Sequence, residues 1–282
     1  ILFEYDLNQV YAGGGVYYRP FRDIFAGIGY SHLQRKIVMP DNEENIRTNT
    51  LYAGLSLLKI SYERQCPVDE FSCEPDIARG VSAGLWFSID DNGDPGISFN
   101  AMYHNSFPFG LVAVGVKREN LDYMYRSNVY LNYATPAILR SRLVFSGQYN
   151  SYEHGTAVDL YDIGSRNNLR GYSYREIVSD EIITANLELR IFPDIEILSI
   201  RDSFILFSDW GTCGNDWLYS LGSGLLLTSS KSTSGTIGRL EVAFPMDRNN
   251  PEPTFIVKTE LPFEILKNLN YNFHPVSREK VY

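Results

Sequence analysis

The sequence predicts an all-β protein, and within that class a transmembrane antiparallel β-barrel of about 14 strands, with 12 or 16 as the alternatives. Apolar and polar residues alternate with a period of two along the whole chain, and helical periodicity is almost absent. The alternating segments run for about 10–14 residues, against about 5–6 for an average strand in a soluble domain. Their polar faces carry many full charges, as the wall of a water-filled interior does and the core of a β-sandwich does not.

The first part of the chain contains strand signals with two irregularities. Alternation over residues 1–8 predicts a short first strand. The following run from Gly13 to Gly15 allows a strong bend or a close approach between neighbouring strands. Further along, the apolar phase flips between Leu57 and Leu58, which indicates a bulge or a missed turn.

Clear strand patterns then follow in both halves of the chain. Alternation alone is also found in any antiparallel sheet with one wet face, so a soluble β-sandwich is the alternative to the barrel. The strongest alternating segments are residues 81–89, 97–103, 112–116, 129–133, 143–149, 183–191, 217–227, 240–244 and 255–263.

The connections between these segments alternate between short and long. Pro20 to Asp23 and Phe107 to Phe109 are typical of tight turns, whereas residues 153–180 form the longest polar connection. Short turns on one rim and long loops on the other are typical of outer-membrane barrels. A connection as long as 153–180 is uncommon unless it folds onto something, so we expect it to tuck into the barrel interior.

The composition excludes several classes of protein. The chain has 282 residues, 44% hydrophobic and 21% charged, and no apolar run approaches the length of about 18–20 residues that a spanning helix needs. A net charge of -9 without clustered Lys or Arg argues against nucleic acid as a partner. The mean hydropathy of -0.20 is compatible with a barrel that has lipid outside and water inside.

Two of the three cysteines, Cys66 and Cys73, lie in a polar loop with proline on either side. We expect this loop to close into a disulfide, which indicates an oxidising compartment such as the periplasm or the cell exterior. Two free thiols in a cytosolic loop are the alternative. Cys213 is then left as a small half-buried residue.

The sequence contains no recognisable catalytic set, so we expect no enzymatic activity, no cofactor and no metal centre. The four histidines are scattered, and there is no Gly-x-Ser-x-Gly elbow, Walker loop or His-Glu-x-x-His motif. An enzymatic barrel of lipase or protease type, with a site assembled from separate strands, is the alternative.

One set of motifs is distinctive. Loop 153–180 contains Leu169-Arg170-Gly171-Tyr172, and it is followed by a strand with Asn186-Leu187-Glu188-Leu189-Arg190 and by another with Phe207-Ser208-Asp209-Trp210-Gly211. In order and spacing these motifs resemble the C-terminal barrel of the outer-membrane insertase and transporter superfamily, which includes BamA, TamA and the two-partner secretion transporters. The resemblance is carried by residues 160–263, and upstream it is limited to barrel-like patterning.

The physical chemistry of these motifs predicts a contact, which we call the latch. If the loop enters the interior, Arg170 arrives as a desolvated guanidinium that needs carboxylates. Glu188 faces the interior by alternation, Asp209 lies on the next strand, and Gly171 lets the backbone turn where a side chain would not fit. The resemblance implies the same pairing of Arg170 with Glu188 and Asp209. The latch either holds a conformation needed to open the barrel or only plugs and stiffens it; the remaining alternative is that Arg170 makes no such contact.

The resemblance covers the barrel and not the periplasmic POTRA domains that usually precede it in the superfamily. We therefore expect residues 1–263 to form the barrel, either taken from a longer protein or belonging to a member without such domains. Residues 264–282 form a C-terminal extension, which we interpret as a partner-binding tail on the periplasmic rim, an extra strand or a disordered end.

The resemblance implies a protein of the outer membrane of a Gram-negative-type bacterium, in contact with outer-membrane lipid or lipopolysaccharide, that moves or inserts polypeptide or lipid. A client polypeptide would bind at a seam between the first strand and residues 253–263, because both segments can present edge groups. One alternative is a plugged barrel that binds accessory subunits or forms a homodimer. Another is a small diffusion pore lined by Arg126, Arg140, Arg142, Glu188, Arg190 and Lys258.

Overall fold

The computed structural model is built from β-strands. It describes residues 6–39, 42–65, 74–120, 125–136, 138–153, 161–162, 169–173, 177–193, 195–197, 199–214, 216–229, 237–248 and 252–260. Every regular element in these ranges is a strand, which confirms the all-β prediction. None of the described segments is a helix with the length and apolarity needed to cross a membrane. Cys66, Cys73 and the extension 264–282 lie outside the described residues, so the predicted disulfide and tail remain predictions.

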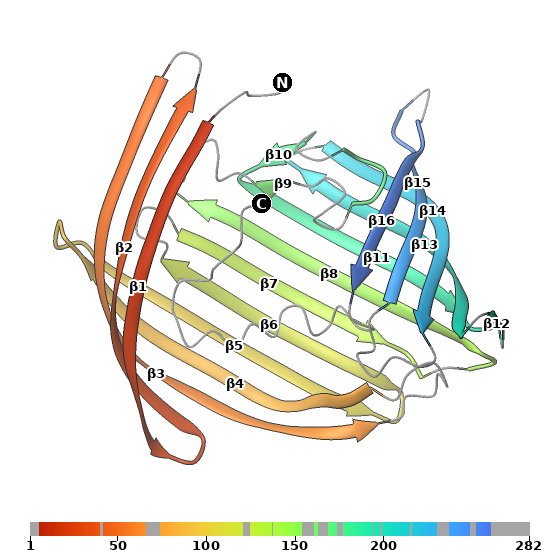
Figure 1. Cartoon of the computed structure of the whole chain (residues 1–282), viewed down its shortest axis with the longest axis horizontal. Coiled ribbons are helices and arrows are strands. Elements are labelled where there is room, and N and C mark those ends of the chain that lie inside the picture. Colours follow the sequence, from red (N-terminus) through yellow and green to blue (C-terminus); the bar gives the residue numbers. More distant parts are fainter. Residues whose placement is uncertain are drawn as a thin grey trace.

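The first eight strands follow one another as antiparallel neighbours (Figure 1). They are β1 (Asp6–Phe21), β2 (Ile24–Met39), β3 (Asn42–Gln65), β4 (Glu74–Asp90), β5 (Pro95–Phe107), β6 (Gly110–Asn120), β7 (Tyr125–Ala134) and β8 (Ser141–Glu153).

The sheet continues from β8 to β11, past the small separate hairpin of β9 and β10. The remaining strands are β9 (Tyr161–Asp162), β10 (Val178–Ser179), β11 (Glu181–Ile191), β12 (Glu196–Ile197), β13 (Ile200–Cys213), β14 (Asp216–Ser229), β15 (Ile237–Pro245) and β16 (Thr254–Glu260).

The described residues place 14 strands in one antiparallel sheet, which is the predicted number. One of the 14, however, is much shorter than the long strands that the alternation predicts. All except β12 lie on one continuous path from β1 to β16, whereas β12 is a two-residue strand that pairs only with β13. The sheet curls round without closing, because β1 pairs only with β2 and β16 only with β15 among the described strands (Figure 1). The fold is thus an open, curved antiparallel sheet with two edges.

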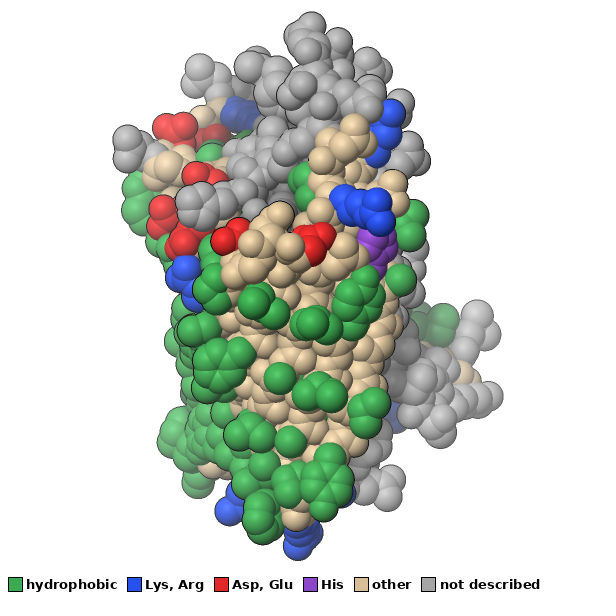
Figure 2. Space-filling model, turned by 90° about the vertical axis from the view of Figure 1, so that its left-hand side faces the viewer, with side chains coloured by type: hydrophobic (Ala, Val, Ile, Leu, Met, Phe, Trp, Pro, Cys, Tyr) green, Lys and Arg blue, Asp and Glu red, His purple; other side chains and the backbone are tan. Residues whose placement is uncertain are grey.

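Apolar and charged side chains are distributed over the two faces of the sheet in the opposite way to a soluble protein. On the outer face large apolar side chains are exposed, including Val16 at 73%, Ile28 at 66% and Val257 at 79%. On the inner face charged and polar side chains are buried, for example Asp209 at 0% and Arg239 at 1% exposure. On the side of the sheet that carries β1 and its neighbours, hydrophobic side chains cover the middle and charged ones gather towards the two ends (Figure 2).

Aromatic rings on the inner face of β1 to β4 pack onto strand glycines. Trp86 makes edge-to-face contacts with Tyr17 and Tyr52, with ring centroids 6.1 and 5.9 Å apart. A Cβ at Gly54 would lie 2.6 Å from the Trp86 ring and overlap the carbonyl oxygen of Leu85. The absent side chain is therefore what lets the ring lie against the backbone.

The irregularity expected at Leu57 and Leu58 is neither a turn nor a break in pairing. β3 is continuous there, and its register with β4 holds until a shift between Glu63 and Gln65. Leu57 is exposed on the outer face and Leu58 is half-buried on the inner one. The apolar phase flips because the exposed apolar surface of β3 ends at this height, and the next outward residue is the exposed Lys59.

The packing on Gly54 can be tested by adding one methyl group. We expect Gly54→Ala to lower the free energy of unfolding by about 1–3 kcal/mol, because the new Cβ overpacks the Trp86 contact. Gly238→Ala on β15 is the matched control: its Cβ would meet Leu227 at an ordinary 3.7 Å, so we expect a change within about 0.5 kcal/mol. Urea unfolding in detergent, followed by tryptophan fluorescence, measures both, and equal midpoints would contradict this account.

Candidate functional site: a buried arginine cluster

The segment Leu169 to Tyr172, here called the loop tip, lies against the inner face of the C-terminal strands. Leu169 and Tyr172 are fully buried and pack with Ile182 of β11 and Leu218 of β14. Arg170, between them, is only 4% exposed. The buried side chains of Leu169 and Tyr172 thus anchor the loop tip, and they hold the Arg170 guanidinium in a position that is shielded from water.

Arg170 makes its most extensive contact with Asp209 of β13. Its Nε donates to Oδ2 at 2.8 Å and its Nη2 to Oδ1 at 2.6 Å, so the pair is bidentate. The backbone N–H of Arg170 also donates to Oδ2, at 3.1 Å. Asp209 therefore fixes both the side chain and the main chain of the loop tip.

The remaining guanidinium nitrogen of Arg170 reaches two further strands. Its Nη1 donates to Glu188 Oε1 of β11 at 2.6 Å and to Glu241 Oε1 of β15 at 3.1 Å. The guanidinium carbon lies 3.5 Å from the centre of the Phe207 ring, a close cation–π arrangement. The structure thus brings together both acidic residues that the sequence pairs with Arg170, and it adds Glu241, which sequence reasoning missed.

Two more arginines complete the group. Glu188 Oε2 accepts from Arg190 Nε at 3.0 Å and Nη2 at 2.7 Å, and Glu188 Oε1 accepts from Arg239 Nη2 at 2.8 Å. Arg239 also donates to Glu241 through Nε at 2.9 Å and through Nη2. We call these six residues the Arg170 cluster: Arg170, Arg190, Arg239, Glu188, Asp209 and Glu241.

The formal charge of the Arg170 cluster is balanced, with three guanidinium groups and three carboxylates, all 7% exposed or less. Burying one ion alone costs several kcal/mol, and the mutual contacts offset that cost only while every partner is in place. Removing one member leaves the others as uncompensated buried charges. The cluster is therefore expected to behave as a single unit.

Glycines on β14 make room for the cluster. Gly222 lies opposite Phe207, and a Cβ there would overlap the ring that supports Arg170. Gly224 lies opposite Glu241, and a Cβ there would come within 2.9 Å of the Glu241 Cγ. With these side chains absent, Arg239 of β15 can reach Glu188 of β11 over β13 and β14.

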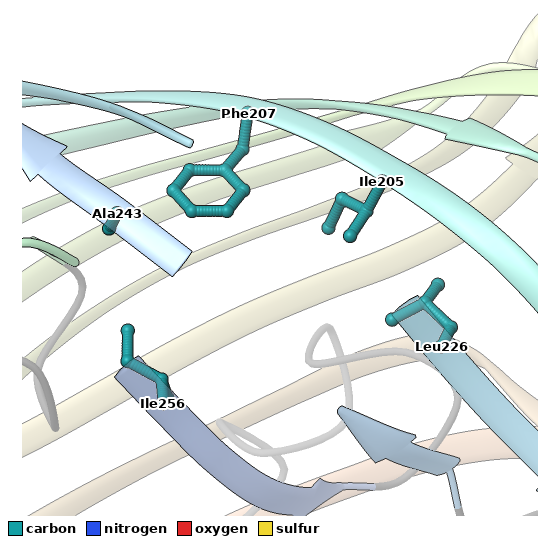
Figure 3. Close-up of a cluster of buried hydrophobic side chains, with 5 residues drawn as sticks. All are labelled: Ile205, Phe207, Leu226, Ala243 and Ile256. Carbon is teal, nitrogen blue, oxygen red and sulfur yellow. The ribbon is translucent and has the colours of Figure 1, made fainter. Parts of the chain in front are cut away.

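Beyond the charges, the inner face carries an apolar patch. Ile205 and Phe207 of β13, Leu226 of β14, Ala243 of β15 and Ile256 of β16 are buried together (Figure 3). Phe207 belongs to this patch and also supports the Arg170 guanidinium. The patch therefore joins the cluster to the last strand of the sheet.

The other half of the loop tip contacts the strands at the C-terminal edge. Gly171 has a φ of +102°, and a Cβ there would lie 3.2 Å from Pro245 N, which favours glycine at this position. Its carbonyl accepts a hydrogen bond from Thr254 Oγ1 of β16 at 3.1 Å.

Tyr172 adds a second connection at the same height. Its hydroxyl donates to the Tyr219 carbonyl at 3.2 Å and to Asp247, and Arg248 lies over its ring at 5.2 Å. Burial, reinforced by the bond to Asp247, raises the pKa of the Tyr172 phenol above its ordinary value, so the hydroxyl remains a donor.

This geometry is suited to holding strands together. Every carboxylate of the cluster bonds at least one arginine from another part of the chain. In the described part of the chain, no group of His, Cys, Asp and Glu is placed to hold a metal ion. The cluster and the loop tip instead connect β11, β13, β15 and β16 through one segment.

Comparison with known proteins adds no assignment: no protein-family model and no curated protein matches the sequence.

A double-mutant cycle measures whether Arg170 and Asp209 act together. We expect Arg170→Gln alone to cost about 3–5 kcal/mol of unfolding free energy, because it leaves buried carboxylates without their partner. Combined with Asp209→Asn, the coupling energy is expected to be about 1–3 kcal/mol.

The matched control is the exposed pair of Arg118 and Glu153, whose charged atoms are 2.8 Å apart with side chains 38% and 49% exposed. Its coupling is expected to stay within about 0.2–1 kcal/mol. An Arg170–Asp209 coupling below about 0.5 kcal/mol would remove the latch as a physical unit.

Proposed function

We propose that this chain forms an outer-membrane β-barrel that moves or inserts polypeptide or lipid across or into the outer membrane, as in the insertase and transporter superfamily that its motifs resemble. The observation that carries the proposal is the Arg170 cluster, which links the loop tip to the strands beside an open sheet edge. In the superfamily, the corresponding arginine pairs with acidic residues on the two strands that here carry Glu188 and Asp209.

The inverted faces of the sheet support a position in lipid. Exposed apolar residues such as Leu51, Leu55 and Leu57 recur at every second position of a strand, while the intervening residues face inward. A transmembrane β-strand needs about 9–11 residues, so four or five outward positions of this kind suffice to cross the hydrocarbon core. In water, the same surface would be a large exposed apolar patch.

The two sheet edges support a role for the seam. An odd number of strands separates β1 from β16 along an entirely antiparallel path, so these two edges run in the same direction (Figure 1). Pairing β1 directly with β16 would be parallel, whereas one additional strand between them would be antiparallel to both. A client strand entering the seam would therefore complete an antiparallel ring by β-augmentation.

The loop tip is placed to influence that seam. Through Glu241 and Thr254 it contacts β15 and β16, and through Glu188 and Asp209 it contacts β11 and β13. In the proposed function, the Arg170 cluster keeps these strands in one arrangement while β16 offers its outer edge to a client.

A second candidate function also has support from the open edges. A barrel that binds a fixed partner or a second copy of itself would use the same edges without transporting anything. In that case the Arg170 cluster would only plug and stiffen the barrel. The two functions differ in what occupies the seam during growth of the cell.

Photo-crosslinking in living cells distinguishes them. A photoreactive residue replaces Val16 on β1 or Val257 on β16, and Val129 on the internal strand β7 is the control, since all three are outward and exposed. We expect both edge positions to capture the same newly made polypeptides, and the β7 position to capture none.

Depleting the chain should then lower the outer-membrane content of the captured polypeptides. Crosslinks that contain only a second copy of this chain, or one fixed subunit, would favour the non-transporting barrel. Equal capture at all three positions would contradict a client seam.

A further inference from the structure

The outer face carries an apolar groove that the proposed transport function does not use. It has a volume of about 730 Å³ and crosses β1 to β4, where Gly14 and Ala53 lie among larger residues such as Val16, Ile28 and Leu51. The volume is within the range of ligand pockets, about 300–1,000 Å³. The groove exists because Gly14 on β1 and Ala53 on β3, in adjacent outward rows of the sheet on either side of β2, lack large side chains.

A polar cluster lies directly beyond one end of this groove. Tyr30, which lines the groove, donates its hydroxyl to Asn49 Oδ1 at 2.7 Å, and Asn49 Nδ2 donates to Asp91 Oδ2 at 2.8 Å. His32 Nδ1 also contacts Asn49 Oδ1 at 2.7 Å. The groove and the polar cluster are thus continuous through Tyr30.

Strand alternation puts both parts on the same face. On β3, Arg47, Asn49, Leu51 and Ala53 are successive outward residues, so the face changes from charged to polar to apolar along one strand. This order matches an amphiphile that lies along the strand with its head group at Arg47.

The polar end carries charges of both signs. Arg47 and Asp91 are exposed, and the hydrogen bond from Asn49 together with the nearby Arg47 charge holds the pKa of the Asp91 carboxyl below its usual value. The site therefore offers a guanidinium for an anion, and a carboxylate, an amide and a phenol for hydroxyl groups.

We propose that the groove and its polar cluster bind one phosphorylated glycolipid of the lipid A type, with an acyl chain in the groove. Arg47 contacts a phosphate, while Asn49 and Asp91 contact sugar hydroxyls. A phospholipid offers the acyl chain and the phosphate but no ring of hydroxyls for the carboxylate and the amide. This proposal depends on the membrane position of the proposed function and not on transport.

The polar cluster lies at the end of the sheet where a phosphorylated glycolipid is expected. β2, β4 and β8 run in the same direction, so Asp91, after β4, lies on the same rim as the loop that follows β8. The superfamily resemblance makes this rim the extracellular one, and the outer leaflet of a Gram-negative outer membrane is the leaflet that carries phosphorylated glycolipid.

The test fills the groove without disturbing the sheet. A Cβ at Gly14 meets no atom within 4 Å, so Gly14→Leu adds a side chain on the groove without a clash at its Cβ. Gly238→Leu adds the same side chain to an outward position on β15, where the nearest contact is an ordinary 3.7 Å. Arg47→Gln removes the proposed phosphate contact.

Native mass spectrometry of the purified chain in detergent, with lipid A or phosphatidylethanolamine added, reads out binding. We expect a one-to-one lipid A adduct for the unmodified chain and for Gly238→Leu, with about tenfold weaker binding for Gly14→Leu and for Arg47→Gln. Phosphatidylethanolamine should form no comparable adduct.

Equal lipid A binding by Gly14→Leu and Gly238→Leu would overturn the site, and equal binding of both lipids would overturn the choice of glycolipid. The seam crosslinks are measured separately, so their loss with lipid A binding intact would contradict the transport function alone. Retained crosslinks without lipid A binding would contradict this inference alone.

Discussion

The three buried arginines of the Arg170 cluster must be neutralised on the inner face of the sheet, and most of the geometry of the C-terminal strands follows from that requirement. Each carboxylate of the Arg170 cluster bonds at least one guanidinium, and Arg170 bonds all three carboxylates. Because one of the arginines comes from a loop rather than a strand, the balance holds only while the loop tip is docked. The loop tip thus supplies a charge that the inner face of the sheet needs, in addition to covering part of that face.

The arginines need partners because the charged side chains of the Arg170 cluster lie on the inner face of the sheet, away from water. A soluble sheet would bury its apolar face and leave arginines in water, whereas here the apolar side chains are outside and the charges inside. The inner face is consequently filled in two different ways. Near β1, aromatic rings pack against strand glycines, and near β16, glycines make room for the charged side chains of the Arg170 cluster. The outer face exposes large apolar side chains instead, and a groove forms where Gly14 and Ala53 leave space among them.

The sequence allowed prediction of the strands and of part of the site, because alternation reports which face a residue occupies. It placed Glu188 on the inner face, and the motif order connected it to Arg170 and Asp209. Glu241 and Arg239 had the same signal, since they alternate with Leu240 and Val242, but their pairing across β14 depends on glycines whose effect appears only in three dimensions. Likewise, β12 is too short to leave a periodic pattern, and the outer groove depends on the register of four strands.

Hydrogen exchange of the backbone amides in Arg170→Gln tests most directly whether the loop tip holds the C-terminal edge of the sheet. If it does, amides of β15 and β16 should exchange at least about tenfold faster than in the unmodified chain, while those of β3 to β5 remain protected, because local opening follows the lost contacts. Thr254→Ala, which removes only the link from β16 to Gly171, should accelerate β16 selectively. Unchanged protection of β15 and β16 in both variants, or an equal acceleration across the whole sheet, would contradict the central role of the Arg170 cluster.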